Sequence, residues 1–140
     1  MRFLCGVLLL IGLVACTTPR PASVVSYRVE TPTKEELVAI DIDANGYVTR
    51  RLRTQTDEFQ LSGADFALIL DQVRAADLPG MRLGDGADAA ATATVIHTIT
   101  TADTRVSFVD AATPASVQPL IVSFQRVMRV AITTPADAHP

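Results

Sequence analysis

Hydrophobic and polar residues alternate along three stretches in the first half of the chain. Between positions 23 and 30, and again between 37 and 43, valine, isoleucine and tyrosine fall on alternate positions. A period of two places the apolar side chains on one face of a strand. A third stretch, 47–54, follows Asn45-Gly46, a dipeptide that favours a tight hairpin because it accepts positive φ angles. The three stretches predict an antiparallel meander whose core-facing residues are Val25, Tyr27, Val29, Val38, Ile40 and Ile42.

A helical period follows the third strand. Apolar residues recur at the spacing that makes one stripe along a helix, and they are Phe66, Ile69, Leu70 and Val73. Ser62 is a favourable N-cap, and Asp65 lies near the positive end of the helix dipole. Phe59 and Leu61 are interpreted as the connection into this helix, which ends at Leu78-Pro79-Gly80.

The second half of the chain shows the same two periods. Two apolar stretches, 92–101 and 104–110, are separated by two residues and predict a second hairpin. The strongest helical period of the chain comes next, with apolar residues at Val117, Leu120, Ile121, Phe124, Val127 and Met128. Ser116 is the expected N-cap, which would place Pro119 at the third helical position, where no intrahelical N–H bond is lost.

The predicted order of elements is β-β-β-α-β-β-α. Each helix has one apolar face, and the strands have one apolar and one polar face. We therefore expect an α+β fold, with an antiparallel sheet of about five strands and two helices on one of its faces. The other face should be polar and exposed, and its candidate residues are Arg28, Asp41, Asp43, Arg51, Arg53 and Arg105.

Arginines are concentrated on the third predicted strand. Alternation places Arg51 and Arg53 on one face of that strand. Asp41 and Asp43 should lie opposite across the hairpin and neutralise them, which argues against acid–base work by the two aspartates. Such charges are ordinary on a strand surface. Arg51, Arg53 and Arg105 are also a candidate surface for binding a partner.

The N-terminal sequence has a different pattern. Arg2 is followed by an uncharged, largely apolar run from Phe3 to Val14. As a helix this run would measure roughly 18 Å, far less than the ~30 Å hydrocarbon core of a membrane. A basic start, a short apolar run and a small residue at Ala15 predict an export signal peptide over residues 1–15.

The end of that run resembles the lipobox of bacterial lipoproteins at all four positions, Leu13-Val14-Ala15-Cys16. The resemblance implies cleavage between Ala15 and Cys16, a diacylglycerol on the Cys16 thiol and an acyl chain on the new amino group. Several acyl chains together anchor a protein stably, and no other cofactor is expected. Thr17 stands where the enterobacterial sorting pattern of this family has an aspartate for inner-membrane retention. It favours the outer membrane, with the protein facing the periplasm.

Composition divides the rest of the chain. Residues 16–22 contain two prolines and should form a lipidated tether, 23–132 a single domain, and 133–140 a flexible tail. Cys5 leaves with the signal peptide and Cys16 carries the lipid, so no thiol remains for a disulfide, a metal site or a nucleophile. The formal charge of −3 argues against nucleic-acid binding.

Candidate chemical groups are few. His97, on a strand face with Val95 and Ile99, is interpreted as a partly buried structural residue, and no second histidine or cysteine joins it in the domain to bind a metal. The loop Gly84–Asp88 offers two carboxylates to Ca²⁺ but lacks the other ligands of an EF-hand, so a solvated turn is favoured. We therefore expect no catalytic site, no metal site and no enzymatic activity.

The second half of the chain resembles emfourin-type domains, small bacterial inhibitors of thermolysin-like metalloproteases, and related uncharacterised domains. The likeness covers residues 59–130 and implies a helix-strand-strand-helix order; the segments that carry it are Gly86-Ala87-Asp88, Thr94–Thr101, Phe108-Val109-Asp110 and Thr113–Ile121. It implies metalloprotease inhibition as an alternative function, to which no individual residue is assigned. The leading hypothesis is a non-enzymatic, lipid-anchored cell-envelope protein that binds another protein or has a structural role.

Overall fold

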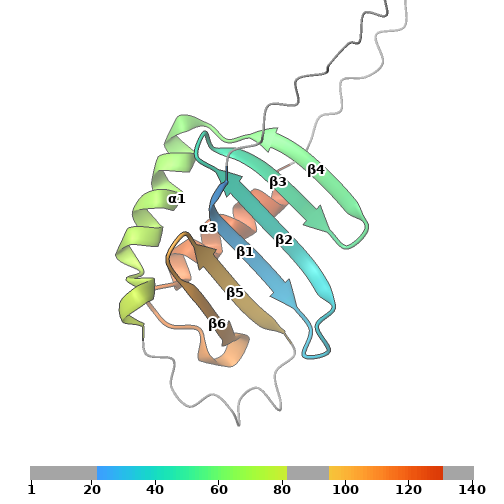
Figure 1. Ribbon diagram of the computed structural model, residues 1–140, viewed down its shortest axis with the longest axis vertical. Helices are drawn as coiled ribbons and strands as arrows, with labels where there is room; N and C mark the ends of the chain where they lie inside the picture. Colours follow the sequence, from blue (N-terminus) through green and yellow to red (C-terminus); the bar gives the residue numbers. More distant parts are fainter. Residues whose placement is uncertain (1–21, 82–94, 131–140) are drawn as a thin grey trace, which may run out of the picture.

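The structure, a computed structural model, describes residues 22–81 and 95–130. They form one antiparallel sheet of six strands in the order β4-β3-β2-β1-β5-β6 (Figure 1). The strands are β1 (Ser23–Glu30), β2 (Glu36–Asp43), β3 (Tyr47–Leu52), β4 (Gln55–Gln60), β5 (Ile96–Thr101) and β6 (Arg105–Val109). The helices are α1 (Gly63–Ala75) and α3 (Gln118–Arg129), with short 3₁₀ turns η1 (Leu78–Gly80) and η2 (Asp110–Ala112). The predicted α+β class is confirmed, with one strand more than expected.

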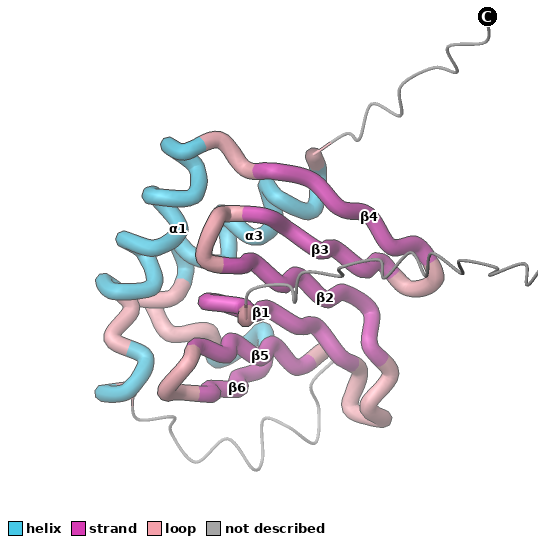
Figure 2. Tube along the Cα trace, turned by 45° about the horizontal axis from the view of Figure 1, so that its top comes forward, coloured by secondary structure: helices cyan, strands magenta, loops and turns pink. Residues whose placement is uncertain are grey.

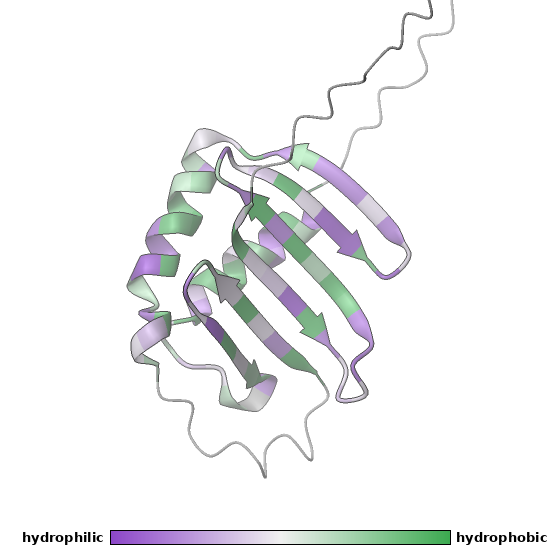
Figure 3. Ribbon diagram, viewed as in Figure 1, coloured by the Kyte–Doolittle hydropathy of each residue, from purple (hydrophilic) through white to green (hydrophobic). Residues whose placement is uncertain are grey.

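The core lies between one face of the sheet and the helices. α3 runs across that inner face, and α1 packs alongside α3 (Figures 1 and 2). The rings of Tyr27 on β1 and Phe124 on α3 stack with their centroids 4.5 Å apart. Alternation along the strands is visible as bands of hydrophobic and hydrophilic residues in Figure 3. The predicted inward residues of β1 and β2 are buried, apart from the half-buried Val38.

β4 occupies a segment that the pattern assigned to a connection. Of its alternate residues, Thr56, Glu58 and Gln60 are exposed, and on the inner side only Phe59 is large and apolar. Asp57, on the same side as Phe59, pairs with Arg50 of β3. An edge strand with a charged residue on its inner face has almost no period-two signal, and for this reason the prediction missed it.

The hairpin between β2 and β3 turns at Asp43–Gly46. Gly46 N–H donates to the carbonyl oxygen of Asp43 over 3.0 Å, and Gly46 alone in this turn has a positive φ, of 76°. The Asn-Gly pair was expected to supply positive φ angles, but only its glycine does so. Phe66 of α1 packs so closely that a Cβ on Gly46 would lie 3.0 Å from its Cγ. The turn therefore also fixes the start of α1 against the sheet.

The two helices begin differently. Ser62 caps α1 as predicted, because its Oγ accepts the N–H of Asp65 over 3.1 Å. The prediction for α3 was wrong: its N-cap is Val117 without any side-chain cap, Ser116 lies in the preceding turn, and Pro119 falls within the first two helical positions. That turn is closed by backbone bonds such as Val117 N–H to Pro114 O, so no side-chain cap is needed.

Candidate functional site

Tyr27, His97 and Asp110 form a hydrogen-bonded row. The Tyr27 hydroxyl lies 2.8 Å from Nδ1 of His97, and Nε2 of His97 lies 2.7 Å from Oδ1 of Asp110. The exposed fraction rises along the row, from 1% for Tyr27 to 16% for the His97 side chain and 51% for that of Asp110. The row therefore links the core to the surface.

Each residue of the row is positioned by its own element. Tyr27 and His97 come from the adjacent strands β1 and β5, whose register pairs His97 with Val29, two residues from Tyr27. Asp110 begins η2 directly after β6, which folds its carboxylate toward the ring. The His97 ring also stacks on Phe108 of β6, with centroids 5.5 Å apart. His97 is thus held by the Phe108 ring and at both of its nitrogens.

The directions of the two hydrogen bonds in the row depend on where its protons lie. Burial, and then the negative charge of Asp110, raise the pKa of the Tyr27 hydroxyl above its ordinary value, so the hydroxyl keeps its proton. With an imidazole proton on Nε2, that group donates to Asp110 and Nδ1 accepts the hydroxyl of Tyr27. Every polar atom of the imidazole has a partner, as the interpretation of His97 as a structural residue anticipated.

The row is poorly suited to nucleophilic catalysis. A triad needs a nucleophile that substrate can reach, and the hydroxyl of Tyr27 belongs to a residue that is 1% exposed. A pocket of about 50 Å³ lies elsewhere, between α1 and α3; its lining includes Leu61, Leu68, Ile69, Val127 and Val130. Within residues 22–81 and 95–130 no three histidine, cysteine or acidic side chains gather to hold a metal ion.

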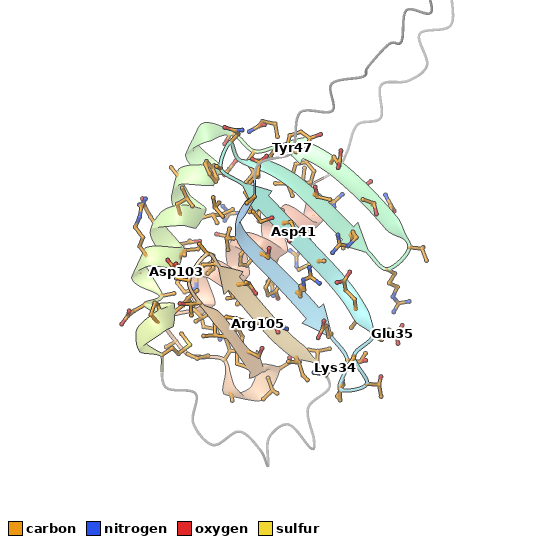
Figure 4. The ribbon with its side chains drawn as sticks, in the orientation of Figure 1. Lys34, Glu35, Asp41, Tyr47, Asp103 and Arg105 are labelled. Atoms are coloured by element: carbon orange, nitrogen blue, oxygen red, sulfur yellow. The ribbon has the colours of Figure 1, made fainter. Side chains whose placement is uncertain are left out.

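The outer face of the sheet carries a network of charges. Nε of Arg51 lies 3.2 Å from Glu36, whose other carboxylate oxygen lies 3.2 Å from Arg28. Nη1 of Arg51 lies 3.7 Å from Asp41, which accepts a 2.6 Å hydrogen bond from Ser26. The predicted neutralisation of Arg51 by Asp41 is confirmed. Figure 4 shows Asp41 on the side of the sheet opposite α3.

The candidate partner surface does not form one patch. Arg53 was expected beside Arg51 on the strand, but it lies in the β3–β4 turn with a φ of 54°. Arg105 lies on β6, at the other edge of the sheet (Figure 4). Four strand spacings separate β3 from β6, or roughly 19 Å. Asp43, the second carboxylate expected to neutralise these arginines, instead accepts the backbone N–H groups of Asn45 and Tyr47 in the β2–β3 turn.

Arg50 is a buried arginine with several partners that the hydrophobic pattern did not single out. It points to the inner face, and its side chain is 5% exposed. Its guanidinium donates to Asp57 over 2.9 Å, to the carbonyls of Val127 and Met128 in the last turn of α3, and to that of Val130, which follows the helix. Hydrogen bonds from Gln55 and then Arg50 hold the pKa of the Asp57 carboxyl below its ordinary value. The sequence pattern singled out Arg51 and Arg53 for the surface and gave Arg50 no role; alternation with Arg51 is the signal that would have placed Arg50 on the inner face.

Several predicted features lie outside the described residues. These are Ala15 and Cys16 of the lipobox, the loop Gly84–Asp88 and the tail 133–140. Within the described part, no helix has both the length and the apolar character needed to cross a membrane.

Compared with protein-family models, curated proteins and solved structures, the chain shows no match. Its function is therefore inferred from its own residues and their geometry.

Proposed function

We propose that the protein is a lipoprotein of the bacterial cell envelope, anchored through Cys16 and serving as a non-enzymatic binding or structural module. The observation that carries the proposal is the lipobox-like Leu13-Val14-Ala15-Cys16, which follows a short apolar run and precedes the first strand, Ser23–Glu30, by only six residues. An anchor at Cys16 would hold the folded part next to the membrane. Thr17 favours the outer membrane, with the protein facing the periplasm.

The folded part supports a binding or structural role. Its most catalytic-looking group, His97, has both ring nitrogens engaged by Tyr27 and Asp110. The outer sheet face carries the charged network of Arg28, Arg51, Glu36 and Asp41 (Figure 4). Among the described residues, β4 and β6 are the edge strands of the sheet. A rigid polar face of this kind suits recognition of another macromolecule better than chemistry on a small molecule.

Lipidation is tested by feeding cells an alkyne fatty acid and reading the label on the purified protein. The wild type should be labelled and membrane-bound, and Cys16→Ser should lose the label and remain unprocessed. Cys5→Ser is the matched control, because it removes the other cysteine without touching the lipobox. Labelling that survives Cys16→Ser, or depends on Cys5, would contradict the proposal.

Partner binding is tested with the lipidated protein purified from crosslinked cell envelopes. The Cys16→Ser variant is the control for contacts that depend on the anchor. A partner recovered at stoichiometric yield with wild type alone is the expected result. Recovery of background proteins alone would favour a structural role over a binding role. Enzymatic turnover of a substrate that depends on His97 would overturn the non-enzymatic proposal.

Inhibition of a thermolysin-like metalloprotease is the second candidate. The helix-strand-strand-helix order implied by the emfourin resemblance corresponds to α1, β5, β6 and α3. The lipidated protein in detergent, mixed at micromolar concentration with thermolysin, should then slow cleavage of a peptide substrate. Unchanged cleavage across a panel of thermolysin-like proteases would reject this candidate and leave the anchored binding module standing.

A further inference from the structure

Large apolar side chains are exposed on one layer of the protein. Among the described residues they are Leu68, 41% exposed, Val122, 50%, and Val130, 38%. Leu68 lies on α1, Val122 on α3, and Val130 directly follows α3. Leu68 and Val130 also line the pocket between the two helices. The sheet face opposite is polar, so the two sides of the protein differ in character.

Positive charge accompanies these apolar residues. Arg126 and Arg129 are exposed on α3, and neither has an ion-pair or hydrogen-bond partner within the described residues. Val122, Arg126 and Arg129 follow one another at the i, i+4, i+7 spacing, so they share one side of the helix. Together α1 and α3 carry three arginines and two aspartates, although the whole chain has a formal charge of −3.

The tether is long enough to bring this layer to a membrane. The chain from Cys16 to Ser23 spans at most about 25 Å. The outer surface of a helix layer lies roughly 15 Å from the plane of the sheet it covers. An anchor at Cys16 can therefore reach past the helices, with Ser23 remaining in the sheet.

We propose that the helix layer, through Leu68, Val122, Val130, Arg126 and Arg129, lies against the anionic surface of the membrane that holds the lipid anchor. The inference rests on the proposed function. Shallow insertion of apolar side chains, together with arginines that meet lipid phosphates, is how amphipathic helix surfaces bind at an interface. Asp65, the one carboxylate that lines the pocket, is bonded by Ser62, and Asp71 pairs with Arg74. Arg126 and Arg129 therefore leave the two helices net positive. The polar sheet face then points away from the membrane.

The test uses the full lipidated protein reconstituted into phosphatidylethanolamine–phosphatidylglycerol vesicles that contain nitroxide lipids. Mature protein has no free thiol once Cys16 is acylated, so Val122→Cys can be labelled singly with a fluorophore. Thr56→Cys, exposed on the sheet face, is the matched control site. We expect nitroxide quenching at position 122 to exceed that at position 56 by at least about twofold, and to fall in 1 M salt or in phosphatidylcholine vesicles.

A second variant separates charge from folding. Arg126→Gln with Arg129→Gln should weaken quenching at position 122 while the thermal midpoint of unfolding stays the same. Equal quenching at the two positions, or stronger quenching at position 56, would overturn the inference and leave the anchor intact. A label at position 122 that responds only when envelope proteins are added would assign the helix layer to a protein partner. Mass spectrometry showing no acyl group on Cys16 would overturn the anchor and the inference together.

Discussion

Arg50 and Arg51 are neighbours in the chain with opposite environments. Arg50 is buried and holds Asp57 and the C-terminal carbonyls of α3, whereas the Arg51 side chain is 36% exposed and pairs with Glu36 and Asp41. Removing one partner of a buried charged network leaves uncompensated polar groups, while an exposed ion pair is weakened by solvent and salt. The same residue type therefore makes very different contributions at consecutive positions.

Truncation of each arginine measures this difference. Arg50→Ala should lower the free energy of unfolding by about 3–5 kcal/mol. Arg51→Ala should lower it by about 0–1 kcal/mol. Urea denaturation followed by circular dichroism gives both values. Equal losses for the two variants would mean that the Arg50 network carries no special stability.

Two features require glycine at position 46: its backbone conformation and the close approach of Phe66. Its φ of 76° and the 3.0 Å approach of Phe66 both oppose a side chain. Gly46→Ala should destabilise the protein by about 1–3 kcal/mol. Gly63 is the control, because a Cβ added there would meet no atom within 4 Å; Gly63→Ala in the first turn of α1 should be neutral or stabilise by up to about 1 kcal/mol. Thermal unfolding of both variants tests the contrast.

At the scale of elements, hydrophobic periodicity predicted the strands and helices that have an apolar face. β1, β2, β3, β5, β6 and both helices were predicted because burial of one face imposes a period on the sequence. β4 was missed because Asp57, which meets Arg50, interrupts its apolar side. The row of Tyr27, His97 and Asp110 was equally hidden. It joins residues up to 83 positions apart in sequence: the β1–β5 pairing brings Tyr27 to His97, and the β5–β6 pairing brings Asp110 to the same ring.

The starts of the two helices give a matched prediction. Ser62 caps α1, so Ser62→Ala should cost about 1 kcal/mol of unfolding free energy. Ser116 lies in a turn before α3 and makes no cap, so Ser116→Ala should change stability by less than about 0.5 kcal/mol. Chemical denaturation of the two variants distinguishes them. A comparable loss at Ser116 would restore the capping role that the sequence pattern assigned to it.

At the scale of the whole molecule, Tyr27 makes stability depend on pH. Its pKa in the folded protein is raised, so the unfolded chain loses this proton first, and the stabilisation present below pH about 10 declines as the pH rises above that value. One such group changes the unfolding free energy by at most about 1.4 kcal/mol per pH unit. Tyr27→Phe should therefore show a shallower loss of stability above pH 10 in urea titrations. An unchanged slope would show that Tyr27 does not ionise on unfolding.

The position of β1 in the sheet has a mechanical consequence. The strand nearest the proposed anchor is not at an edge: it lies between β2 and β5 and bonds to both. Ladder hydrogen bonds run perpendicular to the strands, so a pull on Ser23 along β1 loads both ladders in shear at the same time. Tension transmitted from a moving membrane through the proposed anchor would therefore be shared by two strand pairs in the middle of the sheet.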